Sequence, residues 1–259
     1  MFLECAEKQK EERWYIIKPH NSSQGKGIWL SNSAEEILQK QKDCIVVSEY
    51  IHNPLLANGL KFDMRIYVAI TCWNPLRIYI YEDGLTRFAT SPYTFDLSSK
   101  ENLFAHLTNY SLNKFADNFE PNDDLDECKG HKWSHYALRE YMKQEGYDVP
   151  TVWGRIDDLI IKAILSIENT VFSAMELNVP YRTNCFEVLG FDILLDAHLR
   201  PWLLEINLSP SLNTDSPLDL KIKGSMIADL FTMMGVVPPD QQFGYDKSYL
   251  LNQNKMSAK

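Results

Sequence analysis

Two kinds of hydrophobic spacing alternate along the chain and predict a mixture of strands and helices. Short runs in which apolar and polar residues alternate are typical of strands, and apolar residues three or four positions apart are typical of amphipathic helices. The predicted strands are Trp14–Pro19, Ile28–Leu30, Cys44–Ser48, Phe62–Cys72, Leu76–Tyr81, Leu85–Ala89, Val188–Leu195 and Trp202–Ile206. The predicted helices are Ser33–Lys42, Trp133–Glu145, Val152–Met175 and Leu220–Met234.

Turn residues and one helical stripe add detail to this outline. Glu82–Gly84 has the composition of a turn between two strands, and the Pro, Asn and Gly residues of His52–Gly59 predict a linker between domains. The longest predicted helix carries an apolar stripe that should pack in the core. That stripe consists of Ile156, Leu159, Ile160, Ala163, Ile164 and Ile167.

A hairpin late in the chain carries the strongest candidate site. A turn centred between His198 and Leu199 sets Asp192 opposite Glu205, and the period of two puts Asn207 on the same face. Carboxylates that face one another repel unless a cation lies between them, and Mg²⁺ prefers such oxygen ligands. The spacing therefore indicates a Mg²⁺ site, with a hairpin whose acids point to solvent as the alternative.

A loop of small residues between two early strands offers contacts for phosphate. Gly25 and Gly27 flank Lys26, and Lys18 lies near the end of the preceding strand. Backbone amides of a glycine hairpin can fold over a polyphosphate while ammonium groups neutralise it. The glycines match neither a Walker A nor a Rossmann loop, since they lie between strands and lack the spacing of either motif. A solvated hairpin with incidental lysines is the alternative.

Charged residues alternate along the strand that follows the predicted linker. Lys61, Asp63 and Arg65 should share one face, because side chains two apart on a strand point the same way. Arg87, in a later run, adds a second guanidinium. A polar strand face in solvent is the alternative.

Two further groups of polar residues are candidate sites. The run 106–111 is dense in neutral hydrogen-bonding side chains, which suit substrate positioning. His131 and His135 have the spacing of a zinc pair on a helix, but no third ligand accompanies them locally.

Composition excludes several functional classes. The 259 residues, 45% of them hydrophobic, can bury a large core, and the net charge of −9 argues against a nucleic-acid-binding surface. An acidic partner would need a local basic patch. The longest uncharged apolar run, Ile66–Leu76, is too short to span a bilayer, which predicts no membrane insertion. Five widely spaced cysteines fit reduced thiols in the cytoplasm.

Taken together, these groups describe a nucleotide site, and their order resembles the tubulin-tyrosine-ligase-like family of ATP-grasp ligases. The resemblance runs from Trp14 to Val237. The matching segments are Ile17–Pro19, Gly25–Gly27, Glu49–Leu56, Lys61–Arg65, Arg87–Ala89, His106–Ser111, Gly190–Asp192 and Trp202–Asn207. Within the family, Asn207–Leu212 and Ser216–Lys223 are most similar to tubulin glutamylases, and Leu208 is similar to chain-initiating members.

The resemblance implies an α/β (α+β) ATP-grasp fold, with mixed and antiparallel sheets flanked by helices. Because only Met1–Arg13 precede the first matching strand, the family's N-terminal domain is expected to be lacking. The expected organisation is a central ATP-grasp lobe over residues 1–59, a C-terminal catalytic domain over 60–238 and a polar tail over 239–259.

The resemblance also implies a role for each candidate residue. The cofactors would be ATP and Mg²⁺. The residues expected to bind the nucleotide are Lys18, Gly25, Lys26, Gly27, Glu49, Tyr50, Ile51, Lys61, Asp63, Thr108 and Asn109, and those expected to bind the metal are Asp192, Glu205 and Asn207. Arg65, Arg87 and Glu205 would be catalytic, and Arg65, Arg87, His106, Arg182 and Lys223 would contact the substrates.

The activity implied is ligation of free L-glutamate to glutamate side chains in the acidic C-terminal tails of tubulin, through an acyl phosphate. The expected state is a monomer in the cytoplasm on the microtubule cytoskeleton, with the cilium, axoneme or basal body as narrower locations. A glycine ligase acting on the same tails and a tubulin-binding member without turnover are the alternatives.

Overall fold

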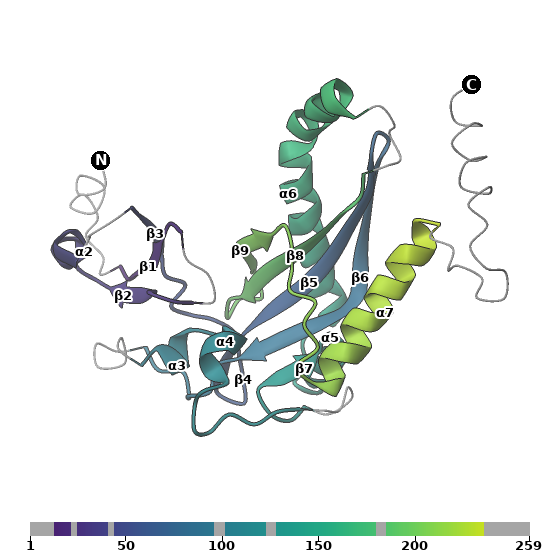
Figure 1. Ribbon diagram of the computed structural model, residues 1–259. Helices are drawn as coiled ribbons and strands as arrows, with labels where there is room; N and C mark the ends of the chain where they lie inside the picture. Colours follow the sequence, from purple (N-terminus) through teal and green to yellow (C-terminus); the bar gives the residue numbers. More distant parts are fainter. Residues whose placement is uncertain are drawn as a thin grey trace, which may run out of the picture.

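The chain builds two antiparallel sheets and a set of helices around the larger one (Figure 1). The computed structural model describes residues 13–21, 25–40, 44–95, 102–122, 128–179 and 185–235. The strands are β1 (Tyr15–Pro19), β2 (Trp29–Ser31), β3 (Ile45–Glu49), β4 (Leu56–Ala57), β5 (Leu60–Trp73), β6 (Leu76–Phe88), β7 (Lys132–Ser134), β8 (Glu187–Leu195) and β9 (Pro201–Asn207). The helices are α2 (Ala34–Lys40), α3 (Leu103–His106), α4 (Tyr110–Asn113), α5 (His135–Gln144), α6 (Val149–Asn178) and α7 (Pro217–Met233).

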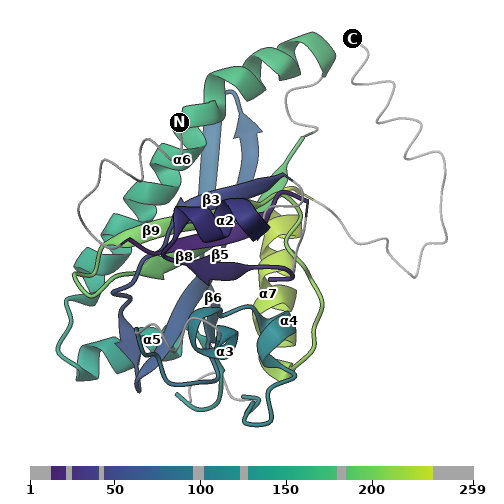
Figure 2. The ribbon, with the colours of Figure 1, turned by 90° about the vertical axis from the view of Figure 1, so that its left-hand side faces the viewer.

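The smaller sheet has the order β2-β1-β3 and is accompanied by α2. Ser33 begins α2 as predicted, because its hydroxyl accepts a hydrogen bond from the amide of Glu36 at 3.2 Å. Figure 2 looks onto this lobe, which stands to one side of the larger sheet and in front of β8 and β9. The lobe therefore faces the larger sheet from the side on which the predicted nucleotide contacts lie.

The larger sheet has the order β7-β6-β5-β8-β9, and β4 pairs with β5 beside this path. The antiparallel β5–β6 hairpin forms its centre, and the β8–β9 hairpin forms one edge. The mixed α/β class with antiparallel sheets, predicted from the sequence, is confirmed.

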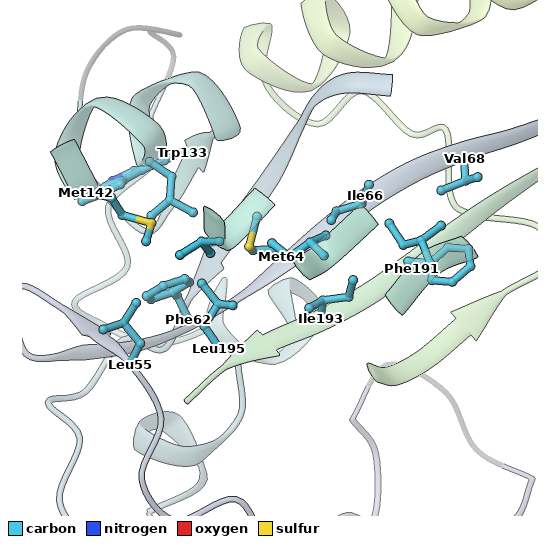
Figure 3. Close-up of a cluster of buried hydrophobic side chains, with 14 of the residues drawn as sticks. Leu55, Phe62, Met64, Ile66, Val68, Trp133, Met142, Phe191, Ile193 and Leu195 are labelled. Carbon is cyan, nitrogen blue, oxygen red and sulfur yellow. The ribbon is translucent and has the colours of Figure 1, made fainter. Parts of the chain in front are cut away.

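Helices cover both faces of this sheet. On one face, α5 and α6 pack against alternate residues of β5 and β8, such as Met64 and Phe191, and this layer holds the main core (Figure 3). On the other face, the buried Leu218, Ile222 and Met226 of α7 pack against Tyr67 of β5. The remainder of that second face carries polar side chains. No helix within the described ranges is long and apolar enough to cross a membrane.

The core stripe of α6 is narrower than predicted. Ile156, Ile160 and Ile164 are fully buried, but Ile167 is 45% exposed. Contact with the same core continues instead through Val171 and Met175, which are partly buried. The C-terminal half of α6 projects past the end of β9, so fewer of its side chains pack against the sheet there (Figure 1).

The predicted turn at Glu82–Gly84 is wrong, because β6 continues through it, with an irregularity in its pairing with β5 between Ile80 and Gly84. Gly84 instead allows a close approach: a Cβ atom there would lie 2.4 Å from the ring of His135 and 2.5 Å from the Arg65 carbonyl. Asp83 accepts a hydrogen bond from the amide of His135 at 2.9 Å and so helps to begin α5. Asp83 and Gly84, which have the composition of a turn, thus position the start of α5 against β6.

The predicted helix Trp133–Glu145 begins two residues late. Trp133 and Ser134 belong to β7, and Ser134 caps α5 by accepting a hydrogen bond from the amide of Ala137 at 2.9 Å. The first two residues of the predicted helix are therefore the end of β7 and the N-cap of α5.

The hairpin register at the predicted metal site is confirmed, although the turn differs from the prediction. Asp192 lies opposite Glu205, and Asn207 lies opposite Gly190. The pairing near the turn centres on His198, and a bulge between Asp192 and Ile193 supplies the extra residue that restores the predicted partner.

Candidate active site

One face of the larger sheet gathers most of the predicted site residues. Register alone places them side by side: Asp63 pairs with Arg87, Arg65 pairs with Asp192, and Asp192 pairs with Glu205. Because side chains alternate along each strand, all five point to the face opposite α6. Residues that are up to 142 positions apart in the chain thus form one polar surface across four strands.

Two arginines and two aspartates form the centre of this surface. Arg65 donates to both oxygens of Asp192, with Nε–Oδ1 and Nη2–Oδ2 distances of 2.5 and 3.0 Å. Arg87 donates through Nε to Asp63 at 2.8 Å and through Nη2 to Asp192 at 2.8 Å. Each guanidinium is therefore held in a fixed plane by bonds to carboxylates, which is the geometry that suits recognition of a planar or tetrahedral oxyanion.

The charge state of this network follows from its contacts. Burial by itself raises the pKa of Asp192, but the positive charge of Arg87 and the hydrogen bond from Arg65 hold that pKa below its ordinary value. For Arg87, burial works against the charged form, and the charges of Asp63 and Asp192 outweigh it and raise the guanidinium pKa. Both shifts favour the charged forms of Asp192 and Arg87, so this ion pair is charged at neutral pH.

The donor set for a magnesium ion lies at the edge of this network. Glu205 is exposed. Asn207 donates to its Oε1 at 3.3 Å, so the two side chains are neighbours on the same face of β9. Asp192 lies across from them but is occupied by both arginines. No cluster of three His, Cys, Asp or Glu residues able to hold a metal occurs among the described residues. The set fits Mg²⁺, which takes one or two carboxylates and leaves its other positions to phosphate and water.

A buried lysine lies at the opposite end of the surface. Lys61, 7% exposed, donates to the hydroxyl of Tyr50 at 3.0 Å, and that hydroxyl lies 2.9 Å from Nδ1 of His106. Burial lowers the pKa of Lys61 to about 7; Asp63 opposes this shift and Lys18 adds to it. Within the described part of the chain, Lys61 has no carboxylate partner at ion-pair distance, so an anion bound here would restore its charge.

The glycine hairpin approaches the same end. A Cβ atom at Gly25, where φ is +77°, would lie 3.0 Å from Oδ1 of Asn109, so the loop passes directly over that side chain. Asn113 fixes the segment by donating to the carbonyls of Leu107 and Asn109 at 2.8 and 3.1 Å. Thr108 is buried within it.

The remaining predicted nucleotide contacts lie at two ends of β1: Gly27, Lys18 and Lys26 near this hairpin, and Glu49–Ile51 beside Trp14 and Tyr15. At Gly27, with φ +72°, a Cβ atom would lie 2.9 Å from the ring of Pro19, next to Lys18, while Lys26 is exposed at the tip. The amide of Tyr50 donates to the Trp14 carbonyl at 2.7 Å, so this amide is engaged within the smaller sheet.

His106 and Arg182 stand apart from the other predicted substrate contacts. His106 is buried behind Tyr50, with the two rings edge to face at 5.6 Å, so it supports Tyr50. Arg182 lies outside the described residues. His131 and His135 do not form a pair: His131 precedes β7, while His135 is buried against Gly84 in the sheet.

A second buried group of charges lies at the far side of the surface; the sequence reasoning named Lys223 of this group as a substrate contact but missed Lys132 and Asp219. Lys132 of β7 lies opposite Arg87, and its ammonium is 2.6 Å from Asp219 of α7. Lys223, one helical turn later, binds the other oxygen of Asp219 at 2.9 Å. The alternation of Lys132, Trp133 and Ser134 is a signal for a strand, which the predicted helix Trp133–Glu145 overlaps.

Charge also favours an acidic ligand for the whole surface. Its cations outnumber its acids: the cations are Lys18, Lys61, Arg65, Arg87, Lys132 and Lys223, and the acids are Asp63, Asp192, Asp219 and Glu205. The chain as a whole carries a net charge of −9, so this surface is a local exception. Together with Lys61, which has no carboxylate partner among the described residues, this excess of positive charge fits a nucleotide polyphosphate.

Comparison with known proteins gives a consistent result. The profile described as "Tubulin-tyrosine ligase family" matches residues 2–243. Human "Tubulin polyglutamylase TTLL5" is 48% identical over 237 residues, which cover 91% of this chain and 18% of that protein. Mouse "Tubulin monoglutamylase TTLL4" is 42% identical over 236 residues, covering 91% and 20%. Human "Tubulin polyglutamylase TTLL13" is 40% identical over 258 residues, covering 97% and 30%.

The chain spans about a fifth to a third of the length of these curated relatives. The matched region nevertheless includes every described strand and helix.

Proposed function

The chain belongs to the tubulin-tyrosine ligase family, and from that premise we propose that it is an ATP- and Mg²⁺-dependent tubulin glutamylase. It joins the amine of free L-glutamate to the side-chain carboxylate of a glutamate in a tubulin C-terminal tail. The matched relatives are called tubulin polyglutamylase or monoglutamylase, which supports glutamate as the added residue.

One observation carries the proposal. Lys61 is buried, has no carboxylate partner at ion-pair distance among the described residues, and shares a polar face with two guanidinium groups fixed by aspartates. A polyphosphate at the Lys18 and Lys61 end would place its terminal phosphoryl group near Arg65 and Arg87. Phosphoryl and acyl transfer both develop negative charge on oxygen, and preorganised cations stabilise that charge.

The proposed reaction has two steps. An oxygen of the tail carboxylate attacks the terminal phosphorus of ATP, which yields an acyl phosphate and ADP. The amine of glutamate then attacks the acyl carbon, phosphate leaves with the former carboxylate oxygen, and the amine loses a proton to solvent. Arg65 and Arg87 would stabilise the acyl phosphate and the tetrahedral intermediate.

Glu205, Asn207 and Asp192 would hold Mg²⁺, which when bound supplies positive charge to neutralise phosphate oxygens. The exposed Glu205 is free to turn toward an ion, whereas Asp192 would contribute a further oxygen while it keeps its arginine contacts. A carboxylate has enough lone pairs for both.

The division between the two sheets supports a two-lobed arrangement. We assign the three-stranded sheet to one nucleotide-binding lobe, and the larger sheet, which begins at β4, to the catalytic domain. The substrate proposal places the protein on the microtubule cytoskeleton, with cilia as a narrower location.

The experiment incubates the protein with ATP, Mg²⁺ and microtubules and supplies glutamate, glycine or tyrosine separately. Mass spectrometry of the tubulin tails should show glutamate increments only. Glycine increments would favour the alternative ligase. Tubulin binding without any increment would favour a binding protein that lacks turnover.

A further inference from the structure

The group of charges formed by Lys132, Asp219 and Lys223 has features of a binding site. All three side chains are buried, with Lys132 6%, Asp219 1% and Lys223 8% exposed. The single aspartate binds both lysines, one through each oxygen. Two ammonium groups therefore share one carboxylate, and within the part of the chain that the structure describes one positive charge is left without an acid in a desolvated place.

The surroundings narrow the approach to these lysines. The Lys132 ammonium lies 3.9 Å from the centre of the Tyr110 ring, which covers it from one side. The Lys223 ammonium donates to the Asn213 carbonyl in the segment between β9 and α7. That segment crosses the same face, since a Cβ atom at Gly190 would lie 2.9 Å from Pro210.

We propose that Lys132 and Lys223, positioned by Asp219, form a binding subsite for the α-carboxylate of the incoming amino acid. This inference rests on the proposed function and assigns each substrate to one part of the surface. The nucleotide would occupy the Lys18 and Lys61 end, the arginine pair would hold the transferred group, and the amino acid would enter at the β7 and α7 end.

The position of Lys132 supports this order. It is the register partner of Arg87, so both side chains leave adjacent strands on the same face. A carboxylate held at Lys132 would place the rest of a small molecule beside the arginine pair. The enclosure by Tyr110 and the 207–216 segment suits a free amino acid better than a polypeptide tail.

The charge of Asp219 is essential to this arrangement. Burial alone raises its pKa, but the hydrogen bond and charge of Lys132, followed by those of Lys223, hold the pKa below its ordinary value. Asp219 also accepts a hydrogen bond from Ser216 at 3.0 Å at the start of α7. It therefore fixes both lysines to one helix end and is a positioning residue.

The test measures steady-state constants for each substrate separately. Lys132→Met keeps the aliphatic stem and removes the charge; we expect the KM for glutamate to rise roughly ten- to hundredfold, while the KM values for ATP and for the tubulin substrate change less than about twofold. Lys132→Arg should restore much of the loss. Asp219→Asn should also raise the KM for glutamate more than it lowers kcat. The matched control is Lys162→Met, which removes an exposed lysine paired with Asp158 on α6.

An unchanged KM for glutamate in Lys132→Met, or an equal rise in the KM for ATP or tubulin, would overturn the subsite. If melting shows that Lys132→Met is misfolded, Lys223→Met is measured in the same way, with the same criteria. Failure of the proposed function is a separate result, because the unmodified protein would then ligate no amino acid at all.

Discussion

The protonation of Lys61 gives the sharpest prediction about nucleotide binding. Its pKa of about 7 lies well below its ordinary value of 10.5, chiefly because the side chain is buried. At pH 8 roughly nine in ten molecules should carry a neutral Lys61. A polyphosphate next to this amine favours the ammonium form, so binding should take up a proton from solvent.

The magnitude follows from this linkage. Above pH 7 each unit of pH should weaken nucleotide binding by up to about tenfold, which corresponds to about 1.4 kcal/mol per unit. The groups facing Lys61 are Asp63, Lys18, Tyr50, Tyr93 and His106. Folding has the opposite dependence: because the unfolded chain binds the extra proton between pH 7 and 10.5, stability from this group rises with pH over that interval.

Isothermal titration with Mg²⁺–ADP at pH 8 in buffers of different ionisation enthalpy measures this uptake directly. We expect close to one proton per nucleotide for the unmodified protein. Lys61→Arg, which stays charged, should abolish the uptake. The control Lys26→Met removes an exposed lysine at the hairpin tip and should weaken binding without changing the uptake. Equal heats in all buffers for the unmodified protein would refute the reasoning.

Three further predictions concern the carboxylates, Gly84 and His135. Glu205→Gln should abolish turnover and change the free energy of unfolding by less than about 0.5 kcal/mol, because Glu205 is exposed. Asp192→Asn should cost about 3–5 kcal/mol in urea unfolding, since it removes the buried carboxylate that Arg65 and Arg87 share and leaves Arg87 with Asp63 alone; equal stability of the two variants would contradict this. Gly84→Ala should lower the free energy of unfolding by about 1–3 kcal/mol or more, because its Cβ would meet His135. The control Gly154→Ala in α6, with open space around it, should be neutral or stabilise by about 0.5–1 kcal/mol. A Gly84→Ala protein as stable as the parent would refute the close approach. Burial lowers the pKa of His135 to about 3, so below pH 6.5 the unfolded chain binds a proton that the native state excludes. The free energy of unfolding should therefore fall by about 1.4 kcal/mol per pH unit from pH 6.5 down to about pH 3. His135→Gln should reduce this slope, and an unchanged slope would show that other groups cause it.

Local spacing was enough to predict much of this fold. The alternation in β5, β8 and β9 fixes which side chains share a face, and the hairpin between β8 and β9 brings Asp192 and Glu205 together by short-range pairing. These relations depend on residues close in sequence. They could therefore be predicted without knowledge of the tertiary structure.

Features that depend on long-range packing were not predictable in this way. Gly84 has the composition of a turn, and only the ring of His135, 51 positions later, explains a glycine within β6. The pairing of Lys132 with Asp219 joins residues 87 positions apart on a strand and a helix. The burial that gives Lys61 its low pKa depends on Tyr50 and His106, which come from other segments.

The order of the reaction on the arginine surface is the central claim, and isotope transfer tests it most directly. Tubulin tails, or tail peptides, labelled with ¹⁸O in their side-chain carboxylates are incubated with ATP, Mg²⁺ and glutamate, and the released phosphate is analysed by mass spectrometry. The acyl phosphate predicts one ¹⁸O atom in phosphate for each isopeptide bond formed. Isopeptide formation with unlabelled phosphate would contradict the account.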